Sequence, residues 1–361
     1  MHAGLVIYDN LQKVSGGYLY DRQLVEYLRR KGDRVSIVSI PWRNYVCHIM
    51  DNFSRPLLER LTHMPLDVLI EDELNHPSCF LLNHLLRERV MYPIVTIVHH
   101  LRSRETHPNW QKVLYHWVER HYLSSVDGFI YNSKDTQRAV EHCIGHRKAS
   151  IVASPGGDRF VQTITEAEIV ERAAQKGPRQ ILFLGNVIPR KGLHILLDAL
   201  AELRTTDWAL TVVGSLTMDE RYARPMVRRS RGIAQSVAYT GIIDDDELAR
   251  HLKTSHVLVV PSSYEGFGIA YLEGMGFGLP AIASTMGGAQ EIIRHGEDGF
   301  LVEPDDSSSL AHFLRLLLHD DKRLVTMSLA AHRHYAAFPT WCETAMRIRT
   351  FLLSLLRDRH A

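Results

Sequence analysis

The sequence predicts an α/β protein of two domains, each built around a parallel β-sheet. The chain has 361 residues, which is long for a single hydrophobic core. Short apolar or β-branched runs alternate with longer helical patterns through the first half, as is typical of βαβ units. The same alternation starts afresh at residue 181. We therefore expect two Rossmann-like domains.

The expected strands are short runs rich in valine, isoleucine and leucine. In the first half they lie at residues 4–8, 34–40, 67–72, 93–100, 128–133 and 149–154. In the second half they lie at residues 181–185, 209–214, 236–241, 256–263 and 280–285.

The expected domain boundary is a charged, helix-prone segment at residues 163–180, which ends in a Gly-Pro pair. An N-terminal domain is expected over residues 1–170 and a C-terminal domain over residues 178–335. Near the end of the chain, Pro339 interrupts a helical pattern, and an amphipathic helix is expected after it.

Composition excludes several classes of protein. The 42 basic residues nearly balance the 41 acidic ones, so no global field attracts nucleic acid, and a small-molecule enzyme is favoured. The four cysteines show no CxxC spacing, which argues against disulfides and a zinc ribbon and for a reducing cytoplasm. No signal peptide and no apolar stretch of roughly 18 residues is found, so any membrane contact is expected to be peripheral, at the inner face.

The most informative stretch runs from Pro261 to Glu273, where an apolar strand ends in a glycine turn that opens a helix. Backbone N–H groups and a positive helix end then lie at the carboxyl edge of a parallel sheet, which suits an anion. Glu265 precedes the turn, about two helical turns before Glu273. Glu273 could accept from ribose hydroxyls and Glu265 could hold a sugar, although ordinary surface charges would give the same pattern.

The segment from Glu265 to Glu273 resembles the Glu-x7-Glu signature of retaining GT-B glycosyltransferases, including Phe267 and Gly268 within it. Residues 278–306 are similar to the same group, as a strand, a glycine turn, a helix and a second glycine turn. The chain thus resembles glycosyltransferase family 4, also called group 1.

This resemblance is close over residues 180–320 and looser over the first half. It implies the GT-B fold, in which two Rossmann-like domains face each other across a cleft. It also implies that the last helix, at about residues 339–361, crosses back to the N-terminal domain. The C-terminal domain would bind the nucleotide-sugar donor, and the N-terminal domain would hold most of the acceptor.

The resemblance points to a second loop, after the strand at residues 181–185, which carries Arg190 and Lys191. Two cations at a βα turn suit a diphosphate leaving group, because negative charge builds on it as the glycosidic bond breaks. Mere solvation of a helix start explains them less well, since positive charge is mildly unfavourable there. The family commonly has arginine where this chain has Asn186, so Arg190 is expected to supply the missing charge.

In the first half, Gly16 and Gly17 lie between the opening strand and its helix, where the backbone could approach a phosphate closely. Any strand-to-helix turn can also require glycine for its geometry alone. His99 and His100 end the strand at residues 93–100. The resemblance identifies His99 as the histidine that hydrogen-bonds the donor sugar or its diphosphate.

Contacts to the nucleotide base are expected from the loop at Ile243 and its neighbours, and further donor contacts from Phe267, Gly268 and Ile269. No metal site is expected, because no His/Cys cluster has ligand spacing and the acidic run at residues 244–246 suits a helix cap. No cofactor is expected besides the donor substrate.

The resemblance implies transfer of a hexosyl group from a UDP- or GDP-sugar to a hydroxyl acceptor such as a glycan, a lipid or a small metabolite, with retention at the anomeric carbon. An epimerase or phosphorylase on the same fold, or a binding protein without catalysis, is the alternative. A dinucleotide oxidoreductase is disfavoured because no full GxGxxG follows either opening strand. The basic run at residues 221–231 is expected to be a solvated helix face, with contact to anionic lipid as the alternative. The oligomeric state is left open.

Overall fold

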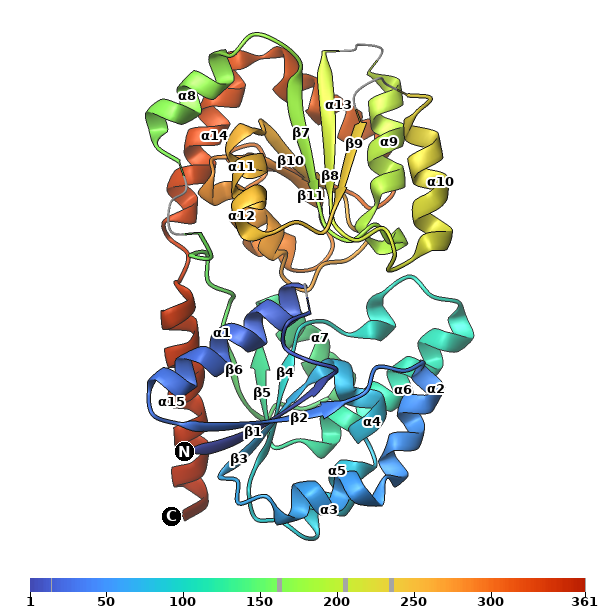
Figure 1. The fold of residues 1–361 in the computed structure, drawn as a ribbon, viewed down its shortest axis with the longest axis vertical. Helices are drawn as coiled ribbons and strands as arrows, with labels where there is room; N and C mark the ends of the chain where they lie inside the picture. The colour runs from blue at the N-terminus through green and yellow to red at the C-terminus, as the bar shows by residue number, and fades with distance from the viewer. Residues whose placement is uncertain (14, 161–163, 204–206, 234–236, 361) are drawn as a thin grey trace. The chain divides into compact units, whose positions relative to one another are not determined.

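The computed structural model describes residues 1–13, 15–160, 164–203, 207–233 and 237–360, with side chains up to residue 357. Thr163 and Ser236, the first residues of the predicted linker and of one predicted strand, lie outside these ranges. The chain forms two compact units, shown in Figure 1. The first comprises Met1–Gly156 and the segment from Pro339 onward, and the second comprises Gly157–Phe338.

The first unit contains a six-stranded sheet with the order β2-β1-β3-β4-β5-β6, in which all neighbouring strands are parallel. Every residue of β3, β4 and β5 is buried. This explains why these strands are continuous apolar runs in the sequence and do not alternate. All six strands were predicted: β1 (His2–Tyr8), β2 (Arg34–Ile40), β3 (Val68–Asp72), β4 (Ile94–Val98), β5 (Gly128–Tyr131) and β6 (Ala149–Val152).

Helices cover this sheet, and their ends are set by local capping. Ser15 accepts a hydrogen bond from the Tyr18 amide at the start of α1, and Ser133 does the same for Thr136 in α7. The helices of the first unit are α1 (Gly16–Arg30), α2 (Tyr45–Met50), η1 (Asp51–Phe53), α3 (Arg55–His63), η2 (Glu73–Asn75), α4 (His76–Cys79), α5 (Leu82–Arg87), η3 (Arg102–Arg104), α6 (Asn109–Ser125), α7 (Lys134–Ile144) and α15 (Trp341–His360).

The helix α15 follows the second unit in the sequence but packs against α1 of the first (Figure 1). Ile348 and Leu352 are buried on its inner side. Thr344 donates a hydrogen bond to the Ser154 carbonyl, and Arg349 forms an ion pair with Asp33 at 2.6 Å. The expectation that the last helix returns to the N-terminal domain is confirmed.

The second unit contains another parallel sheet of six strands, with the order β12-β11-β10-β7-β8-β9. Five of its strands were predicted, but β12, a four-residue strand that follows the turn at Gly296, was not. The strands are β7 (Arg179–Leu184), β8 (Trp208–Val213), β9 (Val237–Gly241), β10 (Val257–Val260), β11 (Ala281–Ser284) and β12 (Gly299–Val302).

The helices of the second unit pack around its sheet to form one core, with Phe183, Trp208 and Leu272 among its fully buried side chains. The helix expected between the glycine turns of residues 278–306 is only the 3-10 turn η5, so that prediction was wrong. The helices are α8 (Glu166–Ala174), η4 (Pro189–Lys191), α9 (Leu193–Glu202), α10 (Glu220–Ser230), α11 (Asp245–Thr254), α12 (Ile269–Gly276), η5 (Gly288–Glu291), α13 (Ser307–His319) and α14 (Asp321–Tyr335).

The segment predicted as a linker contains α8, which packs against α14 within the second unit. Arg172 of α8 is buried and donates hydrogen bonds to the carbonyl oxygens of Phe277 and Gly278. Among the described helices of the chain, none has the length and apolar character needed to cross a bilayer.

Candidate active site

The predicted donor-binding residues of the second unit meet at the carboxyl edge of its sheet. Glu265 lies in the loop between β10 and α12 and is buried. Its Oε1 atom accepts hydrogen bonds from Lys191 Nζ at 2.5 Å and from Ser262 Oγ at 2.6 Å. Lys191 ends η4, in the loop after β7. Two loops that are 74 residues apart in the sequence are thus joined by one buried ion pair.

Arg190 adds a second cation to this pair. Its Nη1 atom lies 3.6 Å from Glu265 Oε1 and donates to the Tyr264 carbonyl at 2.8 Å. The Asn186 side chain accepts from the Ser215 amide at 3.1 Å, so it holds the ends of β7 and β8 together. Arg190 thus places a guanidinium beside Glu265, and its role in replacing the family arginine at position 186 stays a prediction.

The electrostatics of this cluster favour an ionised Glu265. Burial by itself raises the pKa of a carboxyl group, because it removes water from the charged form. The charges of Lys191 and Arg190, with the hydrogen bonds from Lys191 and Ser262, outweigh burial and lower the pKa of Glu265 to about 2. The site thus holds one carboxylate between two cations, which leaves a net positive charge for an anionic ligand.

Glycines make this close approach of loops possible. Gly287 has φ +87°, and a Cβ on it would lie 1.9 Å from the Glu265 carbonyl oxygen. The Gly288 amide donates to that same oxygen at 2.8 Å. At Gly185, a Cβ would lie 3.3 Å from Lys191 Cε. The turn after β11 and the end of β7 therefore fix the positions of Glu265 and Lys191.

Glu273, the predicted ribose ligand, lies on α12 and is buried. Arg159 Nη1 donates to its Oε1 at 2.7 Å, and Arg159 Nη2 contacts Asp245 Oδ1 at 2.5 Å. Burial raises the pKa of Glu273, and the charge of Arg159 opposes that rise. Arg159 was not predicted. It lies 86 residues before Asp245 in the sequence, and no motif connects the two residues.

The remaining predicted donor contacts divide into core and surface positions. Phe267 is buried in the hydrophobic core, so its ring is a packing residue, whereas its backbone lies at the start of α12. Gly268 caps α12 with φ +103°, and Ile269 begins that helix and is half-buried. Ile243 packs against the same core and immediately precedes the Asp244 cap of α11, which accepts from the Glu247 amide as predicted.

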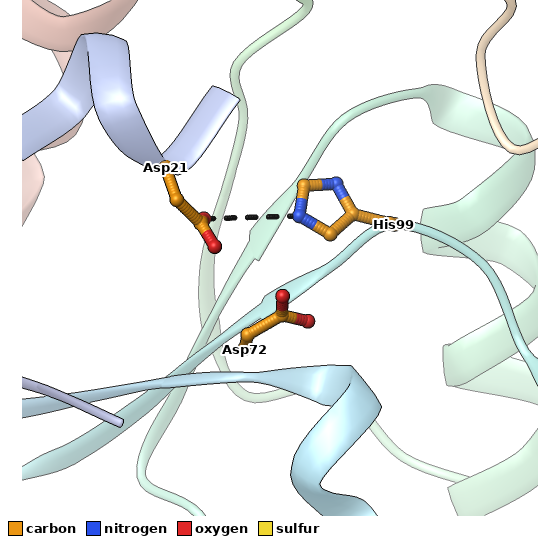
Figure 2. Close-up of side chains that lie close together, drawn as sticks. All are labelled: Asp21, Asp72 and His99. Atoms are coloured by element: carbon orange, nitrogen blue, oxygen red, sulfur yellow. Dashed lines mark ion pairs between the residues drawn. The ribbon is translucent and has the colours of Figure 1, made fainter. Parts of the chain in front are cut away.

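In the first unit, the structure brings His99 and Gly17 together. A Cβ on Gly17 would lie 3.2 Å from the His99 ring, so the glycine leaves room for the imidazole. Gly16 is exposed at the start of α1. Figure 2 shows His99 facing Asp21 of α1 and Asp72, which ends β3. His99 Nε2 lies 3.8 Å from Asp21 Oδ1.

This buried trio was not predicted. Asp21 and Asp72 are almost completely inaccessible to water. Asp21 lies on α1 and Asp72 ends β3, whereas His99 directly follows β4. Burial lowers the pKa of His99, but Asp21 and Asp72 outweigh this and raise it to about 9. Burial and the charge of Asp21 raise the pKa of Asp72 well above its ordinary value. The cluster therefore contains a protonated imidazole paired with Asp21.

Ligand atoms of Asp21, Asp72 and His99 all lie within 4.8 Å of one another, as do those of Glu73, His76 and Glu119. Sequence spacing could not reveal either group, because the residues come from separate elements. The absence of a catalytic metal stays a prediction.

His100 contacts Glu105 at 2.9 Å and is half-buried, which gives it a structural partner. The basic run at residues 221–231 lies largely on α10, where Arg224 pairs with Glu220 at 2.5 Å and Arg229 pairs with Asp198. These partners agree with the expectation of a solvated helix face.

Comparison with known proteins gives the decisive observation. Residues 165–334 match the family model described as glycosyl transferases group 1, which covers nearly all of the second unit. The second unit is a domain of the group 1 glycosyltransferase family. The family assignment made from Glu265, Glu273 and residues 278–306 is confirmed.

Solved structures show the fold of the chain over nearly its whole length. Sucrose-phosphate synthase from Thermosynechococcus elongatus has a TM-score of 0.84 at 20% identity, and the match covers 99% of each chain. Anabaena Alr3699/HepE in complex with UDP and glucose has a TM-score of 0.77 at 19% identity, covering 98% of this chain and 99% of the other. The chain has the GT-B fold, as predicted.

Curated relatives of the chain align with it over part of their length. D-rhamnosyltransferase WbpZ of Pseudomonas aeruginosa is 31% identical over 62% of this chain and 58% of its own. A GDP-mannose-dependent alpha-(1-6)-phosphatidylinositol monomannoside mannosyltransferase of Mycolicibacterium smegmatis is 33% identical over 59% of this chain and 58% of its own. The matches thus span less than two thirds of these relatives.

Proposed function

We propose that this protein is a retaining hexosyltransferase that uses a UDP- or GDP-sugar as donor and a hydroxyl group of a glycan, a lipid or a small metabolite as acceptor. The observation that supports this most is the cluster of the buried Glu265 with the half-buried Lys191 and Arg190, beside the N-terminus of α12. It combines two cations with the free amides of a helix start, a combination that suits a diphosphate. The proposed setting is the cytoplasm.

The proposed reaction breaks the bond between the anomeric carbon and the diphosphate oxygen while the acceptor oxygen bonds to that carbon on the same face. The acceptor proton passes to the departing diphosphate, so the protein need not supply a base. Lys191 and Arg190 would stabilise the charge that develops on this leaving group. Glu265 would hold the sugar and the lysine, Glu273 the ribose, and His99 would donate a hydrogen bond to the donor substrate.

The relatives support this choice over the alternatives. The proteins similar to this chain include an enzyme described as dependent on GDP-mannose and a structure in complex with UDP and glucose. D-inositol 3-phosphate glycosyltransferase of Geodermatophilus obscurus, 29% identical over 63% of this chain and 52% of its own, is another. An epimerase would convert a nucleotide sugar without an acceptor, and a binding protein would release no nucleoside diphosphate.

Thermal unfolding in the presence of UDP, GDP and ADP tests donor binding. One nucleotide should raise the melting temperature of the wild type but not of Glu273→Gln, because the amide weakens the acceptor for ribose hydroxyls. Glu297→Ala, at an exposed position of the same unit, is the matched control and should respond like the wild type. If none of the three nucleotides shifts the wild type, the proposal fails.

Release of the nucleoside diphosphate from the matching donor sugar then tests catalysis. Lys191→Ala should lower kcat by about 100- to 1,000-fold, which is typical for loss of one group that stabilises developing charge. The variant should stay folded, as circular dichroism can verify. Lys253→Ala, which removes an exposed lysine paired with Glu168, is the control. Equal rates in the Lys191 variant and the wild type would exclude the proposed role of the lysine.

A further inference from the structure

Two helical elements of the first unit carry large apolar side chains on their outer sides. On α2 and η1 these are Val46, Met50 and Phe53, which follow the spacing of one helix face. On α6, Trp110, Val113 and Trp117 follow the same spacing. The relative exposure of these six residues ranges from 49% to 70%. We call these six positions the α2–α6 surface.

The inner sides of the same elements are fully used for packing. On α6, Val118 and Tyr122 are buried in the core, whereas the outer residues Trp110 and Val113 stay about 70% exposed and Trp117 touches the core only through Phe80. Soluble helices normally carry polar residues on that side. An exposed apolar surface of this extent normally marks a binding site.

The two elements are neighbours in the fold. Both pack against α4, and Figure 1 shows α2 and α6 at the same side of the first unit. The ring centroids of Tyr45, the first residue of α2, and Tyr115 of α6 are 4.7 Å apart. Arg102 lies over both rings, at 5.4 Å and 5.0 Å. The elements α2 and α6 are therefore neighbours on the same side of the first unit.

The exposed charges around the α2–α6 surface are mainly basic, although α3 also carries the exposed Glu59. Asp51 and Glu119 are the only acidic residues of α2, η1 and α6, and both are buried. The cations at its margins include Arg120, which is exposed on α6, and Arg55, which is exposed directly after η1. A ligand that complements this surface is apolar with a negative margin.

Two of the five tryptophans of the chain, Trp110 and Trp117, belong to this surface. Tryptophan prefers the boundary between lipid headgroups and hydrocarbon, because its ring is apolar and its N–H is polar. A symmetric contact with a second copy of the chain would instead place cations against cations.

We propose that the α2–α6 surface is a docking site for an anionic lipid bilayer. The apolar side chains would enter the boundary region of one leaflet, and the marginal arginines would contact the lipid phosphates. This inference goes beyond the proposed transfer reaction and does not depend on it, because it uses none of the residues assigned to that reaction.

Flotation with vesicles tests the proposal. The full chain should bind vesicles of phosphatidylglycerol and phosphatidylcholine, and binding should weaken at high salt, because the arginine contacts are screened. The double variant Trp110→Gln/Trp117→Gln should bind at least about 10-fold more weakly, since it removes two large apolar groups. Its melting temperature should not change, because both positions are exposed.

The matched control is Met218→Gln/Met346→Gln, which removes two exposed apolar side chains outside this surface and should bind like the wild type. Quenching of tryptophan fluorescence by brominated lipid in the wild type, but not in the double variant, would support the proposal independently. Wild-type protein that does not float, or a double variant that floats equally well, would overturn it. So would a dimer in light scattering that the double variant dissociates, because it would assign the surface to a second copy.

Discussion

Glu265 shows how a few side chains decide the charge of the candidate donor site. Burial opposes ionisation, yet Lys191 and Arg190 bring the pKa of this carboxyl to about 2. Since this value lies below the ordinary value, the ionised carboxyl stabilises the folded protein above about pH 4.5, and this contribution is lost as the pH falls towards 2. Throughout the neutral range the cluster keeps its two cations and one carboxylate.

His99 has the opposite dependence on pH. Its pKa rises from 6.5 to about 9 on folding, so the stabilisation from its ion pair is fully present below pH 6.5 and is lost as the pH rises through about 9. In this window the wild-type protein should therefore lose stability as the pH increases.

The variant Asp21→Asn should remove most of this pH dependence, because the histidine loses its nearest negative charge. Melting temperatures measured from about pH 6 to pH 9.5 should show the largest difference between variant and wild type at the acidic end. Asp127→Asn is the control, because the partner of Asp127 is Arg87, which stays charged throughout this range. A difference that is constant with pH for Asp21→Asn would contradict the ion pair.

At the scale of elements, the sequence predicted eleven of the twelve described strands, most clearly those whose residues are buried on both sides. The runs at residues 93–100 and 256–263 stand out because parallel strands between two helical layers must be apolar throughout. The strand β12 and the turn η5 could not be predicted in this way. Each has four residues, and contacts with neighbouring strands, not local pattern, fix their conformation.

The candidate site was predictable to the extent that its residues lie at the ends of such strands. Lys191, Glu265 and His99 follow β7, β10 and β4, and a motif or a resemblance singled them out. Arg159 and Asp21 had no comparable signal. Arg159 meets Glu273 only through tertiary packing, and Asp21 is one acidic residue of a helix until the fold places it beside His99.

The turn after β11 gives a prediction for an element that contains no catalytic group. Gly287→Ala should destabilise the protein by about 2 kcal/mol or more, because its Cβ would overlap the Glu265 carbonyl and the residue has φ +87°. Gly296→Ala is the control, with φ +82° but no atom within 4 Å of a Cβ, and should cost only about 1 kcal/mol. Urea unfolding measures the free energy of unfolding of both variants. Equal decreases in the two variants would contradict the prediction, because they would mean that the overlap at residue 287 does not destabilise the protein.

At the scale of the whole molecule, α15 makes the first unit discontinuous in sequence. Trp341 is buried at the start of this helix, with its ring 5.7 Å from that of Tyr20. The chain leaves the first unit after Gly156 and returns to it at Pro339. A Cβ on Gly156 would lie 2.2 Å from the Trp341 amide nitrogen, so these two segments are in direct contact. The stability of the first unit therefore depends on residues that follow the second.

The variant Trp341→Ala should destabilise the first unit by about 3–5 kcal/mol, which is typical for a large buried aromatic side chain. Hydrogen exchange should then show faster exchange in β1–β6 and little change in β7–β12, because each sheet has its own core. Met346→Ala, exposed on the same helix, should leave both sheets protected. Equal loss of protection in the two sheets would contradict separate stabilities.

The return of α15 also constrains the order in which a ribosome can produce a finished fold. Synthesis delivers β1–β6 first, then the entire second unit, and only afterwards the helix that covers α1. The second unit is continuous and can complete its core during translation. The first unit must wait with Tyr20 and the rest of its α1 surface uncovered, so of the two it is the part of the nascent chain that most needs protection from aggregation.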